Sequence, residues 1–190
     1  MSASLAHQFA ESFRAVRGQA HLAPDDAAVV AVITGIVRDA GATCVALAAL
    51  PEPLCTHLAD ALRGAGVEVL GPDYATATLP LALDRAEIGV TGMAFGIAQT
   101  GTLAEVCTDD AVRLVSGLPR AHIGMVRAED LVDTLLNAAP RLRGLFAEHE
   151  KNVTVSFISG PSRTGDIELV LTLGVHGPET AHAVIVGATA

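Results

Sequence analysis

The sequence predicts an α/β fold, with a mainly parallel sheet flanked by helices. Short apolar runs of strand length alternate with longer segments in which apolar residues recur every three or four positions, as on one face of a helix. The connections between these segments are short, which is typical of consecutive βα units. The apolar runs are continuous rather than alternating, as expected for strands buried on both faces of a parallel sheet.

Five segments have the periodicity or the start signals of helices. In the first, Leu5, Phe9 and Phe13 share one face. The second begins at Asp25 and Asp26, where the helix dipole favours acidic side chains. The expected helices span residues 4–17, 24–40, 53–65, 81–85 and 128–150.

The expected strands are short and rich in Val, Ile, Leu and Ala. They span residues 43–48, 67–70, 87–91, 122–126, 153–158 and 182–186. In addition, residues 103–107 and 112–116 are expected to pair as a hairpin around the turn residues 108–110. Residues 166–173 fit either a helix or an extended run.

Length and composition indicate a single folded unit. We expect an N-terminal helical segment at residues 1–24, followed by one α/β domain at residues 25–190. Apolar residues make up 51% of the chain and aromatic residues only 3%, so the core must be built from Ala, Val, Leu and Ile.

Charge and composition argue against several classes of partner. Nucleic acids and anionic membrane surfaces attract cationic proteins, whereas this chain has a formal net charge of −9. The N-terminus lacks the continuous apolar segment of a signal peptide, and no run of about 18 apolar residues occurs. We therefore expect a cytoplasmic protein that binds no nucleic acid and does not insert into a membrane.

The cysteines do not form a recognisable ligand pattern. Cys44, Cys55 and Cys107 are far apart in the sequence, which fits neither a disulfide framework nor a CxxC metal site. No histidine pair has a metal-ligand spacing such as HxxxH. We expect no metal site and no iron–sulfur cluster in this chain.

Two loops concentrate glycine and hydroxyl side chains. The first, residues 92–102, follows the predicted strand 87–91, and the second, residues 159–166, follows the predicted strand 153–158. Open α/β sheets bind ligands beyond the carboxyl ends of their strands. Glycine-rich turns with Ser and Thr also form nests of N–H groups that bind anions. We therefore expect the two loops to form one pocket for an anionic small molecule.

Arg163 is the expected anchor of that ligand, because a guanidinium binds a carboxylate or phosphate through two hydrogen bonds. A helix beginning at Thr164 or Gly165 would add the partial positive charge of its N-terminus. Taken singly, each hydroxyl also fits a turn or a helix cap. The predicted ligand-binding residues are Thr91, Gly92, Thr100, Gly101, Thr102, Ser159, Gly160, Ser162, Arg163 and Thr164.

Candidate acid–base residues lie in or near the second loop. His176 is the first candidate, because histidine titrates near neutrality, although its imidazole also fits hydrogen bonding within a turn. Asp166 and Glu168 are further catalytic candidates, and each also fits a paired or solvated charge. His122 either faces the site or caps its strand. Glu105 follows the first loop, and we expect it to be exposed on the predicted hairpin.

Five motifs together resemble the lactate-utilisation (LUD) domain family. They are TG at 91–92, AQTGTL at 98–103, LPRAHI at 118–123, FISGPSRTGDIE at 157–168 and GVHGP at 174–178. The ordered combination of the last two is the most specific part of the resemblance, which covers residues 25–190. The resemblance implies a fold similar to that of the sugar-phosphate isomerase and CoA-transferase-like α/β proteins.

The resemblance also implies a function. It implies a role with partner proteins, one of them an iron–sulfur protein, in oxidising L-lactate to pyruvate. The longer family members carry cysteine-rich cluster motifs, which this chain lacks. We therefore expect an accessory subunit that binds an anionic small molecule, has no cofactor of its own and relies on an iron–sulfur cluster in a partner.

Two alternatives remain open at this point. One is a stand-alone isomerase or acyl/CoA-type transferase that acts on an anionic metabolite. The other is a non-catalytic regulatory or scaffolding protein whose loops shape an interface.

Overall fold

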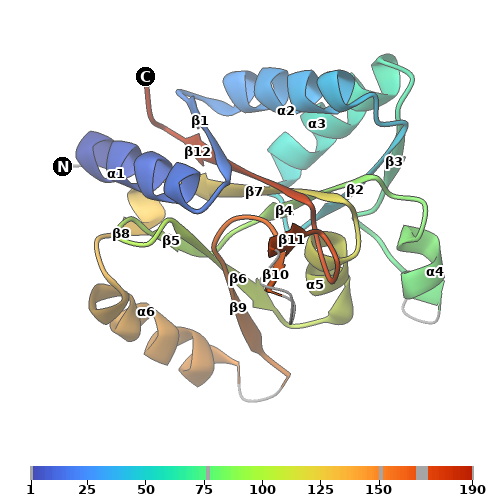
Figure 1. Cartoon of the computed structure of the whole chain (residues 1–190). Coiled ribbons are helices and arrows are strands. Elements are labelled where there is room, and N and C mark those ends of the chain that lie inside the picture. Colours follow the sequence, from blue (N-terminus) through green and yellow to red (C-terminus); the bar gives the residue numbers. More distant parts are fainter. Residues whose placement is uncertain (1, 76–77, 150–151, 166–170, 190) are drawn as a thin grey trace.

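A computed structural model describes residues 2–75, 78–149, 152–165 and 171–189. Its centre is a six-stranded sheet in which all neighbouring strands are parallel, in the order β1-β12-β7-β4-β2-β3 (Figure 1). In that order the strands span Gln19–Ala23, Thr180–Val186, Ala121–Arg127, Ile88–Gly92, Cys44–Ala48 and Glu68–Leu70. The predicted fold class, a mainly parallel sheet flanked by helices, is confirmed.

Two helices, α2 (Asp26–Ala40) and α3 (Glu52–Gly64), cover one face of the central sheet (Figure 1). Ile33 of α2 and Leu58 of α3 are fully buried in the cluster that these helices form with the sheet. Burying a side chain of this size contributes about 1.5–3 kcal/mol. This layer is therefore a main source of the stability of the fold.

The other face carries helices and a smaller sheet, ordered β8-β5-β6-β9. Strand β6 is antiparallel to both β5 and β9, whereas β5 and β8 are parallel. The four strands span Leu131–Val132, Phe95–Ile97, Thr102–Cys107 and Thr154–Ile158. The helices on this side are α1 (Ser2–Ala15), α4 (Leu79–Leu83), α5 (Asp110–Gly117) and α6 (Leu135–Glu148).

Side-chain caps define where several helices begin. Asp25 accepts a hydrogen bond from the backbone N–H of Ala28 at 2.8 Å, at the start of α2. Gly41 ends the same helix in the left-handed conformation, with φ of 64°. Both signals are readable in the sequence, which is why the bounds of α2 were predicted closely.

The predicted hairpin at 103–107 and 112–116 is wrong. The first segment is strand β6, but the second belongs to helix α5. Asp109 accepts a hydrogen bond from the backbone N–H of Ala111 at 2.8 Å and thereby caps this helix. An aspartate in such a position fits a turn and a helix start equally well from sequence.

Three other expectations need correction. The strand predicted at 153–158 is β9, which pairs with β6 in the smaller sheet and not in the parallel one. The helix predicted at 128–150 is divided into a 3₁₀ turn at Ala128–Asp130, strand β8 and helix α6. Of residues 166–173, the last three form strand β11 (Leu171–Leu173), while 166–170 lie outside the described residues.

The N-terminal segment contains the predicted helix and also β1, a strand that the sequence analysis did not predict. Phe9 and Phe13 of α1 are fully buried and stack on one another, with ring centroids 5.8 Å apart. They belong to the same cluster as Ala183 and Ile185 of β12. Helix α1 and strand β1 are thus packed into the central structure.

Two buried histidines on the central strands resist protonation. His182 of β12 lies 3.2 Å from His21 of β1, measured between Nδ1 and Nε2, so one ring donates a hydrogen bond to the other. Burial, with a smaller contribution from His21, lowers the pKa of His182 to about 4. Burial also lowers the pKa of His122 on β7 to about 4.

These shifts couple stability to pH. A histidine in the unfolded chain gains a proton below about pH 6.5, whereas the two buried rings stay neutral until about pH 4. The unfolded state therefore binds more protons within this window. Lowering the pH from about 6.5 to about 4 should destabilise the folded state.

We predict that His182→Gln makes stability less sensitive to acid. Between about pH 6 and pH 4.5, the slope of the unfolding free energy against pH should fall by up to about 1.4 kcal/mol per pH unit. Urea unfolding at several pH values measures this slope. His57→Gln, a change at an exposed histidine of α3, serves as the control and should leave it unchanged. Equal slopes for the wild type and His182→Gln would contradict the prediction.

Candidate functional site

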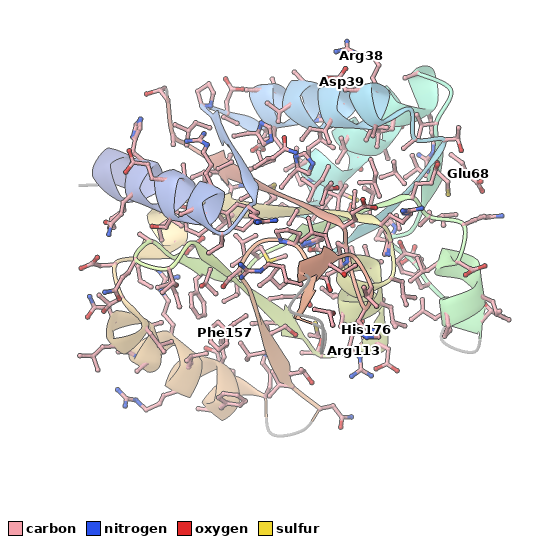
Figure 2. All side chains as sticks on the ribbon, in the orientation of Figure 1. Arg38, Asp39, Glu68, Arg113, Phe157 and His176 are labelled. Carbon is pink, nitrogen blue, oxygen red and sulfur yellow. The ribbon has the colours of Figure 1, made fainter. Side chains whose placement is uncertain are left out.

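A pocket of about 510 Å³ opens between helix α5, strands β6 and β9, and the turn around His176. Its volume lies within the range of about 300–1,000 Å³ that is typical of small-molecule sites. Figure 2 labels three of its side chains, Arg113, Phe157 and His176, on the side of the central sheet that carries the smaller sheet. The pocket is lined by Glu105, Arg113, Ser116, Gly117, His122, Ser156, Phe157, Ile158, Ser159, Gly160, Pro161, Ser162, His176, Gly177, Pro178 and Ala181.

Hydrogen bonds hold the two predicted loops together. The hydroxyl of Thr102 lies 2.6 Å from that of Thr100 and 2.8 Å from that of Ser159, so the three form a continuous chain. On the other side, the backbone N–H of Ser162 donates to the carbonyl oxygen of Pro178 at 2.8 Å. The GVHGP turn is therefore fixed against the SGPS segment, and the first loop against the same segment.

The structure brings some of the predicted ligand-binding residues to the pocket. Ser159, Gly160 and Ser162 line it, as does the acid–base candidate His176, which is exposed. Thr102 is buried behind Ser159, and Thr100 is exposed at the end of the hydroxyl chain.

Other predicted residues lie elsewhere. Arg163 begins strand β10 (Arg163–Gly165), with an exposed side chain, and neither it nor Thr164 is among the residues that line this pocket. The helix start considered at Thr164 or Gly165 is wrong, because β10 forms an antiparallel hairpin with β11. Asp166 and Glu168 lie outside the described residues.

The glycines of both loops allow close approach of backbone to backbone. Gly101 has φ of 59°, and a Cβ there would lie 2.3 Å from the backbone N of Phe13. Gly160 has φ of 74°, and a Cβ there would lie 2.3 Å from the carbonyl oxygen of Val16. A Cβ on Gly92 would lie 2.0 Å from the carbonyl oxygen of Ala49. In each case the neighbour is backbone: Gly101 and Gly160 approach the chain near the end of α1, whereas Gly92 approaches Ala49.

Glu105 is the residue that the sequence analysis placed wrongly. It was expected to be exposed, but it is 1% exposed and lines the pocket. Its Oε1 accepts hydrogen bonds from Sγ of Cys107 at 3.3 Å and from Oγ of Ser116 at 3.1 Å. Burial raises the pKa of the Glu105 carboxyl above its usual value, and the two hydrogen bonds oppose this shift.

Strand periodicity contains a signal for this inward orientation. Leu103, Glu105 and Cys107 alternate along β6, and all three are buried. Residues two apart on a strand point to the same face, so a glutamate between two buried residues points inward with them. This alternation was not used in the prediction, because residues 103–107 were assigned to a hairpin on which Glu105 was expected to be exposed.

His122 faces the pocket, which settles the alternative left open for it. Its ring is 1% exposed, and its Nε2 lies 2.8 Å from Oγ1 of Thr91, with which it shares a hydrogen bond. With a pKa lowered to about 4 by burial, the imidazole is neutral at physiological pH. Thr91, a predicted ligand-binding residue, thus contacts a pocket residue.

The described ranges contain neither a metal-binding cluster nor a membrane-spanning helix. There, no group of three or more His, Cys, Asp or Glu side chains is placed to hold a metal ion. None of the described helices is both long and apolar enough to cross a bilayer.

Comparison with known proteins decides the family. A sequence model of the LUD domain matches residues 6–186. The chain belongs to the LUD domain family. The resemblance found from the five motifs is therefore confirmed, and the match extends further toward the N-terminus than the motifs indicated.

Several curated relatives carry the name "Lactate utilization protein C". The relative from Deinococcus radiodurans is 34% identical over 164 residues, which cover 80% of this chain and 76% of the relative. The relative from Shouchella clausii is 36% identical over 107 residues, covering 55% of this chain and 47% of the relative. The aligned segment thus spans about half the length of the latter protein.

A solved structure shares the fold. The crystal structure of a DUF162 family protein from Deinococcus radiodurans superposes with a TM-score of 0.60, covers 98% of both chains and is 22% identical. At this level of identity the likeness concerns the fold alone.

We predict that the glycine in the second loop is required for stability. Gly160→Ala should lower the unfolding free energy by about 1–3 kcal/mol, because the methyl group meets the carbonyl oxygen of Val16, just beyond the end of α1, and the residue has positive φ. Gly35→Ala is the matched control: nothing lies within 4 Å of its Cβ. There, within helix α2, alanine should stabilise by about 0.5–1 kcal/mol. Equal urea midpoints for the two variants would contradict the prediction.

Proposed function

We propose that this chain is an accessory subunit of a cytoplasmic L-lactate-oxidising system and binds a small carboxylate in the pocket. An iron–sulfur cluster that accepts the electrons would belong to a partner protein. Membership of the LUD family and the relatives named "Lactate utilization protein C" support the lactate-utilisation role. The observation that supports the ligand-binding role is the pocket, whose wall is built by the motif segments SGPS and GVHGP.

The charges around the pocket suit an anion at its entrance. Arg113 of α5 supplies the guanidinium among the lining residues and forms an ion pair with Asp110, one turn away on the same helix. The side chains of the pair are 52% and 55% exposed, so the guanidinium is open to solvent on the pocket side. In a chain with net charge −9, an anion must be held by such a local cation and by hydrogen-bond donors.

Hydroxyl groups supply those donors. Ser156, Ser159 and Ser162 line the pocket together with His176. Serine hydroxyls donate and accept hydrogen bonds, so they satisfy a carboxylate and an adjacent hydroxyl or carbonyl group equally well. L-lactate and pyruvate both present a carboxylate next to such a group, and they are the ligands we assign to the site.

One observation favours the alternative of a stand-alone enzyme on an anionic metabolite. Glu105 and His122 are buried in the same pocket that has His176 at its rim. Titratable groups held in different environments within one cleft are typical of acid–base catalysis. An isomerase or acyl transferase would use the same three residues without a partner protein.

We predict that Arg113 contributes to ligand binding. Saturating L-lactate or pyruvate should raise the melting temperature of the wild type, and Arg113→Ala should reduce that increase, because stabilisation follows RT ln(1 + [L]/Kd). Loss of a charge-assisted contact of about 1.5–3 kcal/mol corresponds to roughly 10- to 100-fold weaker binding. Thermal-shift titration of the wild type and of Arg113→Ala measures the ligand-induced increase in melting temperature.

Arg38→Ala is the matched control for this experiment. Arg38 also forms an exposed ion pair with a nearby aspartate, Asp39, but on α2, on the opposite side of the central sheet (Figure 2). Its removal should leave the ligand-induced shift unchanged. Arg163→Ala tests the anchor predicted from sequence in the same assay. Identical shifts for Arg113→Ala and Arg38→Ala would remove Arg113 from the site.

A further inference from the structure

One oxygen atom in the pocket wall lacks a partner. Both hydrogen bonds to Glu105 end on Oε1, which accepts from Cys107 and from Ser116. Its Oε2 is buried and has no hydrogen-bond partner within the described part of the chain. Buried polar atoms are rarely left in this state, and such an exception calls for a partner that the folded chain alone does not supply.

The surroundings of Glu105 do not favour an ionised carboxylate. A buried charge without a counter-ion costs several kcal/mol. Arg113, the arginine of the pocket wall, pairs with Asp110, and among the described residues it forms no ion pair with Glu105. Burial also raises the pKa of the carboxyl. A neutral acid, with the carbonyl oxygen at Oε1 and the hydroxyl at Oε2, fits both donors and leaves one O–H without an acceptor.

We propose that Glu105 determines ligand specificity by donating a hydrogen bond from Oε2 to a carboxylate oxygen of the molecule in the pocket. This inference rests on the proposed function, since it assumes that the pocket binds a small carboxylate. The terminal torsion of a glutamate side chain is soft, so a small rotation turns Oε2 toward a ligand at low cost. No bond is broken: the proton stays on Glu105 and is shared with the ligand.

The protonation states of the groups around Glu105 affect how ligand binding depends on pH. Burial is the main cause that raises the pKa of the Cys107 thiol to about 12, so Cys107 remains a donor throughout the neutral range. His122 is neutral above about pH 4. Arg113 is positive at every relevant pH. His176, at the rim, is the remaining titratable group that lines the pocket.

Loss of the Glu105 proton should therefore weaken binding. Above the pKa of Glu105, the ligand carboxylate would face a second carboxylate, and affinity should fall by up to about tenfold per pH unit. Glutamine reproduces the neutral acid: its carbonyl oxygen replaces Oε1 as the acceptor, and its NH₂ group replaces the Oε2 hydroxyl as the donor. Alanine removes the donor altogether.

The test is calorimetric titration with L-lactate and with pyruvate at a series of pH values above about 4.3, the ordinary pKa of a glutamate. Glu105→Gln should bind both probes and lose the pH dependence seen in the wild type. Glu105→Ala should bind roughly 10- to 100-fold more weakly. Glu129→Gln, a change at an exposed glutamate, is the matched control and should keep the wild-type profile. Repeating the series in the His176→Gln background tests whether the pH dependence persists without that imidazole.

The outcomes are distinguishable. If the wild type binds and Glu105→Gln shows the same pH profile, the role of Glu105 is overturned while the proposed ligand class stands. If the wild type binds neither probe, both are overturned. Infrared spectra of the unliganded protein give a readout that needs no ligand and no alanine variant: a protonated-carboxyl band that persists above about pH 4.3, the ordinary pKa of a glutamate, should disappear in Glu105→Gln. Its absence from the wild type would contradict the inference.

Discussion

The pocket depends on the contact between the end of helix α1 and the backbone of two glycines. Gly101 and Gly160 belong to different loops, yet a Cβ on either would lie 2.3 Å from a backbone atom at or just beyond the end of α1. Because both loops pack against the same short stretch of chain, their hydroxyl groups meet as Thr102 and Ser159. The N-terminal helix thus positions the pocket wall, although it lines none of it.

The second sheet gives the pocket its depth. Strand β6 is paired on both sides, with β5 and β9, and α5 packs against it. Glu105 is therefore buried on β6, where it lines the pocket beside α5. Glu105 and His122, which line the pocket, and Cys107, which donates to Glu105, have pKa values shifted by burial toward their neutral forms. Charge is confined to the rim, at Arg113. Such an arrangement attracts an anion at the entrance and recognises it by hydrogen bonds within.

The sequence predicts those parts of the fold that local signals determine. Helix α2 has an aspartate cap, an apolar face and a terminal glycine, and each of these is local. The partner of β9 is not a local property: an apolar run shows that a strand exists but not which strand it pairs with. The same limit explains Glu105. Its burial depends on α5 and on β9, which begins 47 residues after β6 ends, as Cys107 and Thr154 define those ends.

The same distinction between local signals and non-local pairing applies to the candidate site. Ser159, Gly160, Ser162 and His176 were predicted from unusual turn composition, which needs no knowledge of strand pairing, and they line the pocket. Arg163 was assigned as the anchor because a guanidinium binds a carboxylate through two hydrogen bonds, but it begins strand β10 and is not among the residues that line the pocket. Arg113 gave no sequence signal, since an arginine one turn from an aspartate on a helix is an ordinary surface pair.

The most direct test of the lactate-utilisation role is purification of the tagged protein from its native cells grown on L-lactate. The eluate is assayed for lactate-dependent dye reduction and for bound iron. The account predicts activity that co-elutes with an iron-containing partner, while this chain expressed alone contains no iron. A single iron-free chain without such activity would contradict the role as a subunit.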